Sequence, residues 1–344
     1  MKIPALHGNY LSVAVALLAL SQGALAEPGV PMMKAIVAHE YGAPETVRYE
    51  DAPRPEPKEN EALVRVIAAG VNPADPLIVS GKYAQAFGTR LPLVPGYDVA
   101  GIVEKTGSGV TKLRVGDAIY GYPLMGGGWA EYCVVTEAEA AAKPKSLTFE
   151  EAAAVPLAAL TAWQALVSAA DVQPGQTVLI HGGSGGVGHF AVQIAKARGA
   201  RVIATASTAN QDLLRELGAD IAVDYTKQKF EDVAKDVDVV LDTVGGETLA
   251  RSYAAVKKGG IVTSIRGRPD RAELEKRGVR GTGIGVTPNA NDLAELTKLI
   301  DAGKLRPSVS QVMLLSDGAK ACAQAATHHT RGKIVLRVAE EPKK

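Results

Sequence analysis

The chain has 344 residues, of which 47% are hydrophobic and 22% charged, and this predicts about two domains of an ordinary soluble globular protein. Its net charge of +1 gives no reason to expect binding to nucleic acid or to an acidic membrane surface. Cys133 and Cys322 are its two cysteines, and because they lack the spacing of a metal site we interpret both as small buried hydrophobic residues.

The N-terminus carries the three parts of a secretory signal peptide. Lys2 precedes an apolar run, and a stretch of small residues that ends at Ala26 supplies a cleavage site. This pattern predicts removal of residues 1–26 and a periplasmic or secreted protein, and the apolar run is too short for a stable membrane span. The alternative is that translation starts at Met32 or Met33, in which case the protein is cytoplasmic.

Short β-rich runs separated by glycine and proline follow, from Ala35 to about Val135. The clearest predicted strands are Ala62–Ala68, Val99–Glu104 and Glu131–Val135. We interpret this part as a small barrel-like β domain. Thr148 and Glu151 then form a capping box, which predicts that a helix begins there.

Residues 177–207 are the most informative part of the sequence, because they read as a strand, a glycine-rich turn, a helix and a second strand. Gly183, Gly185 and Gly188 form a GxGxxG pattern at the turn. In this context the first glycine permits a tight reversal, the second lets a pyrophosphate approach the backbone, and the third allows close packing of helix on strand. The free N–H groups around Ser184 and the positive end of the helix predict a dinucleotide site.

The end of the second strand discriminates between cofactors. An NAD site usually places an acidic residue there, but the stretch around Thr205 and Ser207 contains no carboxylate. Ser207 and Asn210 could donate to a 2′-phosphate and Tyr225 could pack on the ribose or adenine, so these residues favour NADPH over NADH. The candidates for a positively charged partner are Lys333, Arg266, Arg268 and Arg271.

Strands and helices alternate through the next part of the chain, which predicts a parallel sheet with helices on both faces. The predicted strands are Val178–His181, Arg201–Thr205, Ile221–Asp224, Val237–Asp242 and Gly260–Ile265, and a helix is expected at Gln211–Leu217. The tail is expected to add helices at Asn291–Ala302 and Ser316–Thr327 and a strand at Lys333–Val338.

Several of these segments resemble those of the medium-chain dehydrogenase/reductases, specifically the zinc-independent quinone oxidoreductase (zeta-crystallin-like) type. The matching motifs, besides the glycine turn, are Ala69–Asp75, Val94–Gly101, Val115–Asp117, Gly127–Tyr132, Ala153–Pro156, Leu160–Trp163, Asp242–Gly246 and Thr330–Leu336. The resemblance implies an α/β protein with a GroES-like β-barrel domain at 33–155 and a Rossmann domain with a doubly wound parallel sheet at 156–288. Residues 289–339 would return to the first domain, and the active site would lie between the two domains.

This chain departs from the zinc-binding branch of the superfamily at the metal ligands. The catalytic cysteine of that branch would fall near Asn72 and its His-Glu pair near Tyr97 and Asp98, where this chain has neither a thiolate nor an imidazole. Because four suitable ligands cannot be assembled, we expect no metal, and catalysis would proceed without a Lewis acid.

The resemblance implies hydride transfer from NADPH to a quinone or an α,β-unsaturated carbonyl compound, in a protein whose relatives suggest a homodimer. Asn72 and Tyr83 are the candidate catalytic residues: the first would lie near the nicotinamide and the second would be a proton donor or a wall of the substrate site. Leu77 replaces an aromatic residue often found in this loop, which weakens the case for a quinone. The implied cofactor contacts are Asn72, Thr161, Gly185, Gly186, Val187, Val244 and Ser264. The alternative function is a non-catalytic NADP(H)-binding redox sensor or structural protein.

Overall fold

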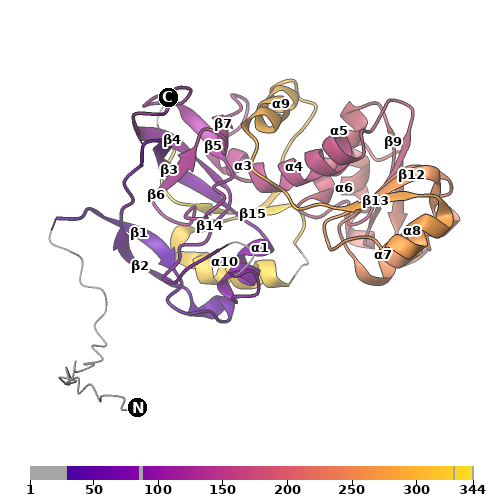
Figure 1. Cartoon of the computed structure of the whole chain (residues 1–344), viewed down its shortest axis with the longest axis horizontal. Coiled ribbons are helices and arrows are strands. Elements are labelled where there is room, and N and C mark those ends of the chain that lie inside the picture. The colour runs from indigo at the N-terminus through magenta and orange to yellow at the C-terminus, as the bar shows by residue number, and fades with distance from the viewer. Residues whose placement is uncertain (1–28, 85–87, 328–329, 343–344) are drawn as a thin grey trace, which may run out of the picture.

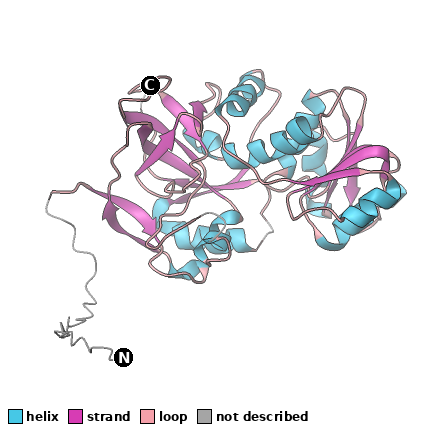
Figure 2. Ribbon diagram, viewed as in Figure 1, coloured by secondary structure: helices cyan, strands magenta, loops and turns pink. Residues whose placement is uncertain are grey.

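The computed structural model describes residues 29–84, 88–327 and 330–342, which form two lobes of different architecture. One lobe is rich in β-strands and contains both the N-terminal part and the end of the chain (Figure 1). The other lobe alternates strands with helices (Figure 2). The predicted signal peptide, 1–26, lies outside the described residues.

A six-stranded sheet forms the middle of the second lobe, in the order β10-β9-β8-β11-β12-β13. Its strands are β8 (Thr177–Ile180), β9 (Arg201–Ala206), β10 (Ile221–Asp224), β11 (Val237–Asp242), β12 (Val256–Ser264) and β13 (Arg280–Gly283). Every neighbouring pair is parallel. If these six strands are renumbered along the chain from β8, their order in the sheet is that of the doubly wound Rossmann fold. The switch point of that fold lies between its first and fourth strands, which are β8 and β11 here. The predicted strands are confirmed, although β12 begins before its predicted start and β13 was not predicted.

The helices of this lobe are α5 (Gly188–Ala197), α6 (Gln211–Glu216), α7 (Gly246–Ser252) and α8 (Arg271–Arg277). The helical spacing of Val187, Phe190, Ala191, Ile194 and Ala195 predicts a buried stripe on the first of them, and the last four are buried whereas Val187 is half-buried. α5 therefore packs against the sheet and leads the chain from the glycine-rich turn into the core.

The β-rich lobe holds a sheet with the order β14-β15-β3-β4-β5-β7, with β6 also paired to β3, and a separate pair β1-β2. Its strands are β1 (Met32–Val37), β2 (Arg48–Pro53), β3 (Glu61–Val71), β4 (Val99–Thr106), β5 (Ala118–Gly121), β6 (Tyr132–Thr136), β7 (Ala140–Ala142), β14 (Val309–Leu314) and β15 (Lys333–Arg337). The last strand pairs antiparallel with β3, so the tail returns to the first lobe as expected. The strands named from the sequence did not include β1, β2, β5, β7 or β14. In β2 and β14 most side chains are not buried, so their apolar pattern is weak.

The remaining helices cover this lobe and connect it to the other. They are α1 (Ala74–Val79), α3 (Phe149–Ala153), α4 (Pro156–Trp163), α9 (Ala290–Asp301) and α10 (Gly318–Ala326), with a π-helical turn at Gln164–Ala169. The predicted capping box is confirmed: the Thr148 hydroxyl accepts from the Glu151 backbone N–H at 3.1 Å, and the Glu151 carboxylate accepts from the Thr148 backbone N–H at 2.9 Å.

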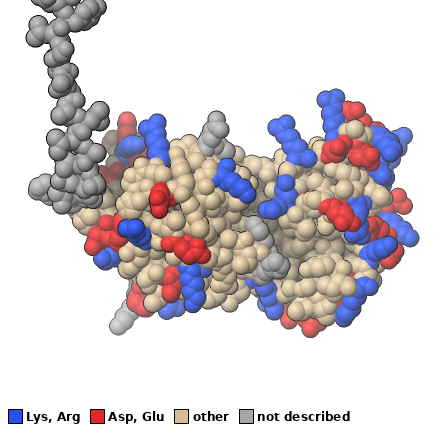
Figure 3. Space-filling model, turned by 90° about the horizontal axis from the view of Figure 1, so that it is seen from below, with Lys and Arg blue, Asp and Glu red and all other residues tan. Residues whose placement is uncertain are grey.

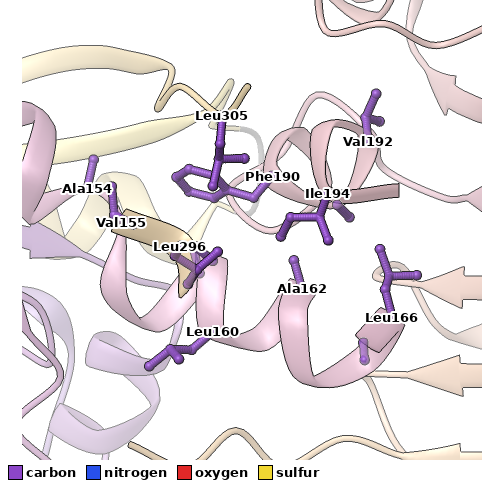
Figure 4. Packing of buried hydrophobic residues seen from close by; sticks show 14 of the residues in the cluster. Ala154, Val155, Leu160, Ala162, Leu166, Phe190, Val192, Ile194, Leu296 and Leu305 are labelled. Carbon is purple, nitrogen blue, oxygen red and sulfur yellow. The ribbon is translucent and has the colours of Figure 1, made fainter. Parts of the chain in front are cut away.

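One hydrophobic core joins the two lobes. Ala162 of α4, Phe190 and Ile194 of α5, and Leu296 of α9 lie between the helices of this core, and Leu160 on another side of α4 belongs to the same cluster (Figure 4). The same cluster continues into β3 of one sheet and β8 of the other. Because these side chains are closely packed around α4, the two lobes are held by apolar burial as well as by the covalent chain.

The surface is mixed in charge. On the face in Figure 3, positive and negative side chains are interspersed and do not gather into a single basic area. Among the described residues, no helix is long and apolar enough to cross a membrane. Cys133 and Cys322 are buried free thiols, as the sequence indicated.

Candidate active site

A cavity of about 1420 Å³ lies between the two lobes, at the carboxyl ends of β8, β9 and β11. Sites for drug-sized ligands usually measure about 300–1,000 Å³, so this one has room for a dinucleotide together with a small substrate. All predicted site residues except Ser264 line it: Asn72, Tyr83, Thr161, Ser184, Gly185, Gly186, Val187, Thr205, Ser207, Tyr225, Val244 and Lys333.

The glycine-rich turn between β8 and α5 has the shape that a phosphate site needs. The left-handed backbone conformation falls on Gly182, with φ of 67°, and not on Gly183, to which the sequence analysis assigned the reversal. A Cβ on Gly183 would instead meet Leu214 at 2.8 Å, so this glycine is needed for packing. The assignment for Gly188 agrees with the structure, since a Cβ there would lie 2.1 Å from the Gly182 carbonyl oxygen.

This turn leaves backbone donors available. The N–H groups of Ser184, Gly186 and Val187 have no backbone acceptor within the described part of the chain. They lie at the N-terminus of α5, where the helix dipole adds positive potential. The residues present therefore fit the pyrophosphate of a dinucleotide.

Side chains that follow β9 and β10 form the end of the cavity suited to an adenosine phosphate. The Ser207 hydroxyl accepts from the Asn210 amide at 3.1 Å, and Tyr225, 62% exposed, offers an open ring. Lys227 lines the same region and was missed by the sequence analysis; its ammonium lies 3.5 Å from the Asp224 carboxylate. It follows the carboxyl end of a predicted strand, a position that could have drawn attention to it.

The predictions for Lys333 and Ser264 need correction. The Lys333 side chain is only 3% exposed and its ammonium points into the β-rich lobe, so it is not the partner of a 2′-phosphate. The reason is that β15, which begins at Lys333, belongs to the sheet of the β-rich lobe. Ser264 is buried and donates to the Asp242 carboxylate at 2.7 Å, so it supports the crevice without facing it. Of the candidate arginines, Arg266 lines the cavity, whereas Arg268 and Arg271 do not.

Lys333, Asn72 and Asp98 instead form one buried polar cluster. The Lys333 ammonium donates to the Asn72 carboxamide oxygen at 2.5 Å and to Asp98 at 3.1 Å. The Asn72 amide nitrogen donates to the same Asp98 oxygen at 2.8 Å. Burial raises the pKa of Asp98, and the adjacent Lys333 charge opposes that rise.

Asp75 binds the backbone next to this cluster. Its carboxyl accepts from the backbone N–H of Asn72 at 2.6 Å and of Gly96 at 3.1 Å. Complete burial raises its pKa to about 7, although both backbone hydrogen bonds oppose the rise. Asp75 thereby connects the loop that carries Asn72 to the loop that carries Tyr97 and Asp98.

Tyrosines line the part of the cavity that the β-rich lobe forms. Tyr83 is 41% exposed, whereas Tyr97 and Tyr122 are buried and pack edge to face with ring centroids 6.5 Å apart. Burial raises the pKa of both buried phenols, that of Tyr122 to about 12. The two buried tyrosines were not predicted as cavity residues. Thr161 lines the cavity and its hydroxyl donates to the Leu157 carbonyl at 2.7 Å.

The residues at this site do not fit a zinc ion. Asn72, Tyr97 and Asp98 occupy the region, and Lys333 already binds the Asp98 carboxylate. Within residues 29–84, 88–327 and 330–342, no group of three His, Cys, Asp or Glu side chains could hold a metal ion. An ammonium group in this position would also repel a divalent cation.

The two histidines beside the turn, His181 and His189, make hydrogen-bond contacts with other parts of the protein. His181 contacts the Ser252 hydroxyl at 2.9 Å and the Thr205 hydroxyl at 3.3 Å through its two ring nitrogens. His189 Nδ1 lies 2.9 Å from the Gly185 carbonyl oxygen. Burial lowers the pKa of each to about 4. Both are therefore neutral at pH 7, consistent with a structural role.

Comparisons with known proteins agree with this geometry. Residues 58–145 match the alcohol dehydrogenase GroES-like domain, and residues 217–336 match the zinc-binding dehydrogenase family. An NADPH-dependent alkenal/one oxidoreductase from chloroplasts of Arabidopsis thaliana is 38% identical over 325 residues, which cover 90% of this chain and 81% of that protein.

Solved structures give the same result. The quinone oxidoreductase of Coxiella burnetii superposes with a TM-score of 0.83 at 35% identity, covering 90% of this chain and 100% of that one. A mycobacterial protein solved in complex with NADPH superposes with a TM-score of 0.79 at 32% identity, covering 89% and 100% of the two chains.

Proposed function

Because this chain belongs to the medium-chain dehydrogenase/reductase family, we propose that it is an NADPH-dependent oxidoreductase that reduces α,β-unsaturated carbonyl compounds or quinones without a metal. The observation that carries the proposal is a continuous cavity. It joins the phosphate-binding turn of one lobe to an apolar, tyrosine-lined wall of the other. Such a cavity can hold a cofactor and a substrate in contact.

NADPH supplies the hydride when it is bound. The protein binds and orients the two reactants: Ser184, Gly186 and Val187 offer backbone donors to the pyrophosphate, and Ser207 and Lys227 bind the 2′-phosphate. Asn72 and Thr161 lie where they can orient the reacting end.

The proton that completes the reduction is best supplied by Tyr83. It lines the cavity and is partly exposed, so water can reprotonate it after each turnover. Tyr97 and Tyr122 are poorer acids because burial raises the pKa of both. They and Leu77 instead provide an apolar surface for the carbon skeleton of the substrate.

A redox sensor without catalytic activity is a weaker alternative. The sequence leaves it open, because Leu77 replaces a loop aromatic residue and no side chain is a firm proton donor by its sequence context. The cavity now brings Tyr83 and Asn72 together with the phosphate turn, and the named relatives are oxidoreductases. Both observations favour catalysis.

The test is oxidation of NADPH by purified protein that begins at Met33, with hexenal, methyl vinyl ketone and a small benzoquinone as acceptors. Hexanal is the matched control, since it has the carbonyl but lacks the activated double bond. We expect turnover with the unsaturated compounds, a lower rate with NADH, and no loss after treatment with a chelator. Binding of NADPH without turnover would favour the sensor, and activity lost to the chelator but restored by zinc would refute the metal-free proposal.

We also propose that the protein is exported and dimeric. The signal-like N-terminus supports export, and mass spectrometry of protein from the native cells would find a mature chain that begins near Glu27; a start at Met32 or Met33 would contradict it. The edge position of β13 supports a homodimer, because an edge strand can pair with its copy. Analytical ultracentrifugation would measure the mass, and a monomer at micromolar concentration would contradict the dimer.

A further inference from the structure

We propose that Lys333 is a positioning residue that holds the Asn72 carboxamide in one orientation at the reacting end of the cavity. This inference rests on the proposed function. It deepens that function by giving a role at the reacting end to the buried Lys333 ammonium, for which the relatives' names state no role. Lys333 is the only lysine or arginine among the buried polar and charged residues of the described chain.

The donors of Lys333 are fully used by the protein. An ammonium group has three N–H donors, and Lys333 contacts three acceptors: the Val71 carbonyl oxygen at 2.9 Å, the Asn72 carboxamide oxygen at 2.5 Å and the Asp98 carboxylate at 3.1 Å. No N–H remains for a substrate. Lys333 therefore acts through Asn72 and does not donate to the reacting atoms.

The cluster determines which way the Asn72 amide faces. Its oxygen accepts from Lys333 and its nitrogen donates to Asp98. A flipped amide would set N–H groups against the ammonium and its oxygen against the carboxylate, so both contacts would become repulsive. The second amide N–H has no acceptor among the described residues, and Asn72 lines the cavity. The cation and the anion together keep this N–H available for a carbonyl or carboxamide oxygen.

The anion is itself fixed from the other side. One Asp98 oxygen accepts from the Leu157 backbone N–H at 2.6 Å, at the start of α4. The other oxygen accepts from Asn72 and Lys333. A Cβ on Gly70 would lie 2.7 Å from this carboxylate, so the adjacent strand leaves it little freedom to rotate. Asp98 is thus a rigid acceptor.

Lys333 also links Asn72 to the phosphate-binding turn. The residue before it, Gly332, donates its backbone N–H to the Ser184 carbonyl oxygen at 2.9 Å. A Cβ on Gly186 would meet the Lys333 side chain at 3.5 Å, so the stem of the lysine runs close to the turn. The same short segment therefore contacts the group that binds pyrophosphate and the amide at the reacting end, which sets the distance between them.

The experiment removes the two buried charges, those of Asp98 and Lys333, together. In D98N/K333M both partners are neutral, so no unpaired charge is buried, but the Asn72 oxygen loses its donor and the amide can flip. We expect the thermal midpoint to stay within a few degrees of wild type while kcat for methyl vinyl ketone falls about 100-fold. The surface variant K196M/D220N, which neutralises a half-exposed Lys–Asp pair away from the cavity, is the control and should retain kcat.

Two further measurements separate positioning from a purely structural role. Adding D98N/K333M to N72A should lower kcat by less than threefold beyond N72A alone, because Lys333 acts through the amide. The second measurement uses NADPH that carries deuterium on the nicotinamide face from which wild-type protein transfers hydride. D98N/K333M should transfer less of this deuterium to the product than wild type does. If the double variant does not fold, Lys333→Gln is the second variant, because it removes the cation but keeps a polar side chain, and the buried Asp98 can be neutralised by a proton. Its amide carries both a donor and an acceptor, so it accepts either orientation of the Asn72 amide, and we expect at least a tenfold loss of kcat.

Wild-type-like kcat and deuterium transfer in folded D98N/K333M, or independent losses in N72A and D98N/K333M, would overturn the inference. So would wild-type-like kcat in folded Lys333→Gln where the double variant does not fold. A different result, in which wild-type protein binds NADPH but reduces none of the acceptors, would instead overturn the proposed function. The two failures are therefore distinguishable.

Discussion

Replacing Gly188 by alanine should damage both the fold and the binding of NADPH. The new Cβ would lie 2.1 Å from the Gly182 carbonyl oxygen and 2.7 Å from the Gly183 Cα. Both are backbone atoms that cannot rotate away, so the start of α5 must move by roughly 1 Å to reach ordinary contact distance. Overpacking of this kind costs about 1–3 kcal/mol. A shift of roughly 1 Å in the groups that position a ligand can cost about 100-fold in activity.

The assay compares G188A with G186A, the same substitution two residues earlier. A Cβ on Gly186 meets no protein atom closer than 3.5 Å, and this residue does not have a left-handed backbone. We expect G186A to keep the thermal midpoint of wild type and to bind NADPH with a Kd less than tenfold weaker. G188A should lower the midpoint by several degrees and raise the Kd by about 100-fold, measured by calorimetry. If the two variants behave alike, the turn does not work by close packing against α5.

Four other changes test separate parts of the molecule. Tyr83→Phe should lower kcat about 100-fold with little change in NADPH binding, and a loss below threefold would mean that solvent supplies the proton. Lys227→Ala should weaken NADPH about tenfold and leave NADH unchanged, as read from Kd values for both cofactors; equal effects would contradict its contact with a 2′-phosphate. Phe190→Ala should destabilise the core between the lobes by about 3–5 kcal/mol in urea unfolding, and a cost below 1 kcal/mol would contradict the packing in Figure 4. Because burial lowers the pKa of His189 to about 4, the unfolded chain binds a proton first and stability falls as pH drops from 6.5 towards 4, by about 3 kcal/mol for this residue. Asp75, with its pKa raised to about 7, gives an opposite slope over that range, so the test is the difference between wild type and His189→Asn; parallel pH curves would refute it.

Local patterns in the sequence are sufficient to predict most of the fold. The alternation of strands and helices, the capping box at Thr148 and the stripe that includes Phe190 each depend on residues close together in the chain. Their periodicity and hydrogen-bonding patterns are written in the sequence itself. The half-exposed strands β2 and β14 were missed, because their pairing depends on neighbours that are distant in the sequence.

The functional site divides in the same way. The phosphate turn could be predicted because all its parts lie in one strand-turn-helix segment. Lys333 could not be interpreted correctly, because only the return of β15 to β3 places it beside Asn72 and turns its ammonium away from the 2′-phosphate region. Burial is likewise decided by the assembled lobes, so the raised pKa values of Asp75 and Tyr122 have no local signature.

The sequence by itself determined that a strand, a glycine turn and a helix would present backbone donors to a phosphorylated cofactor, since those donors and their spacing are local. The tertiary structure alone decided which side chains meet at the reacting end. Asn72, Asp98 and Lys333 come from three separate parts of the chain, and the pairing of β15 with β3 is what buries the opposite charges of Asp98 and Lys333 together.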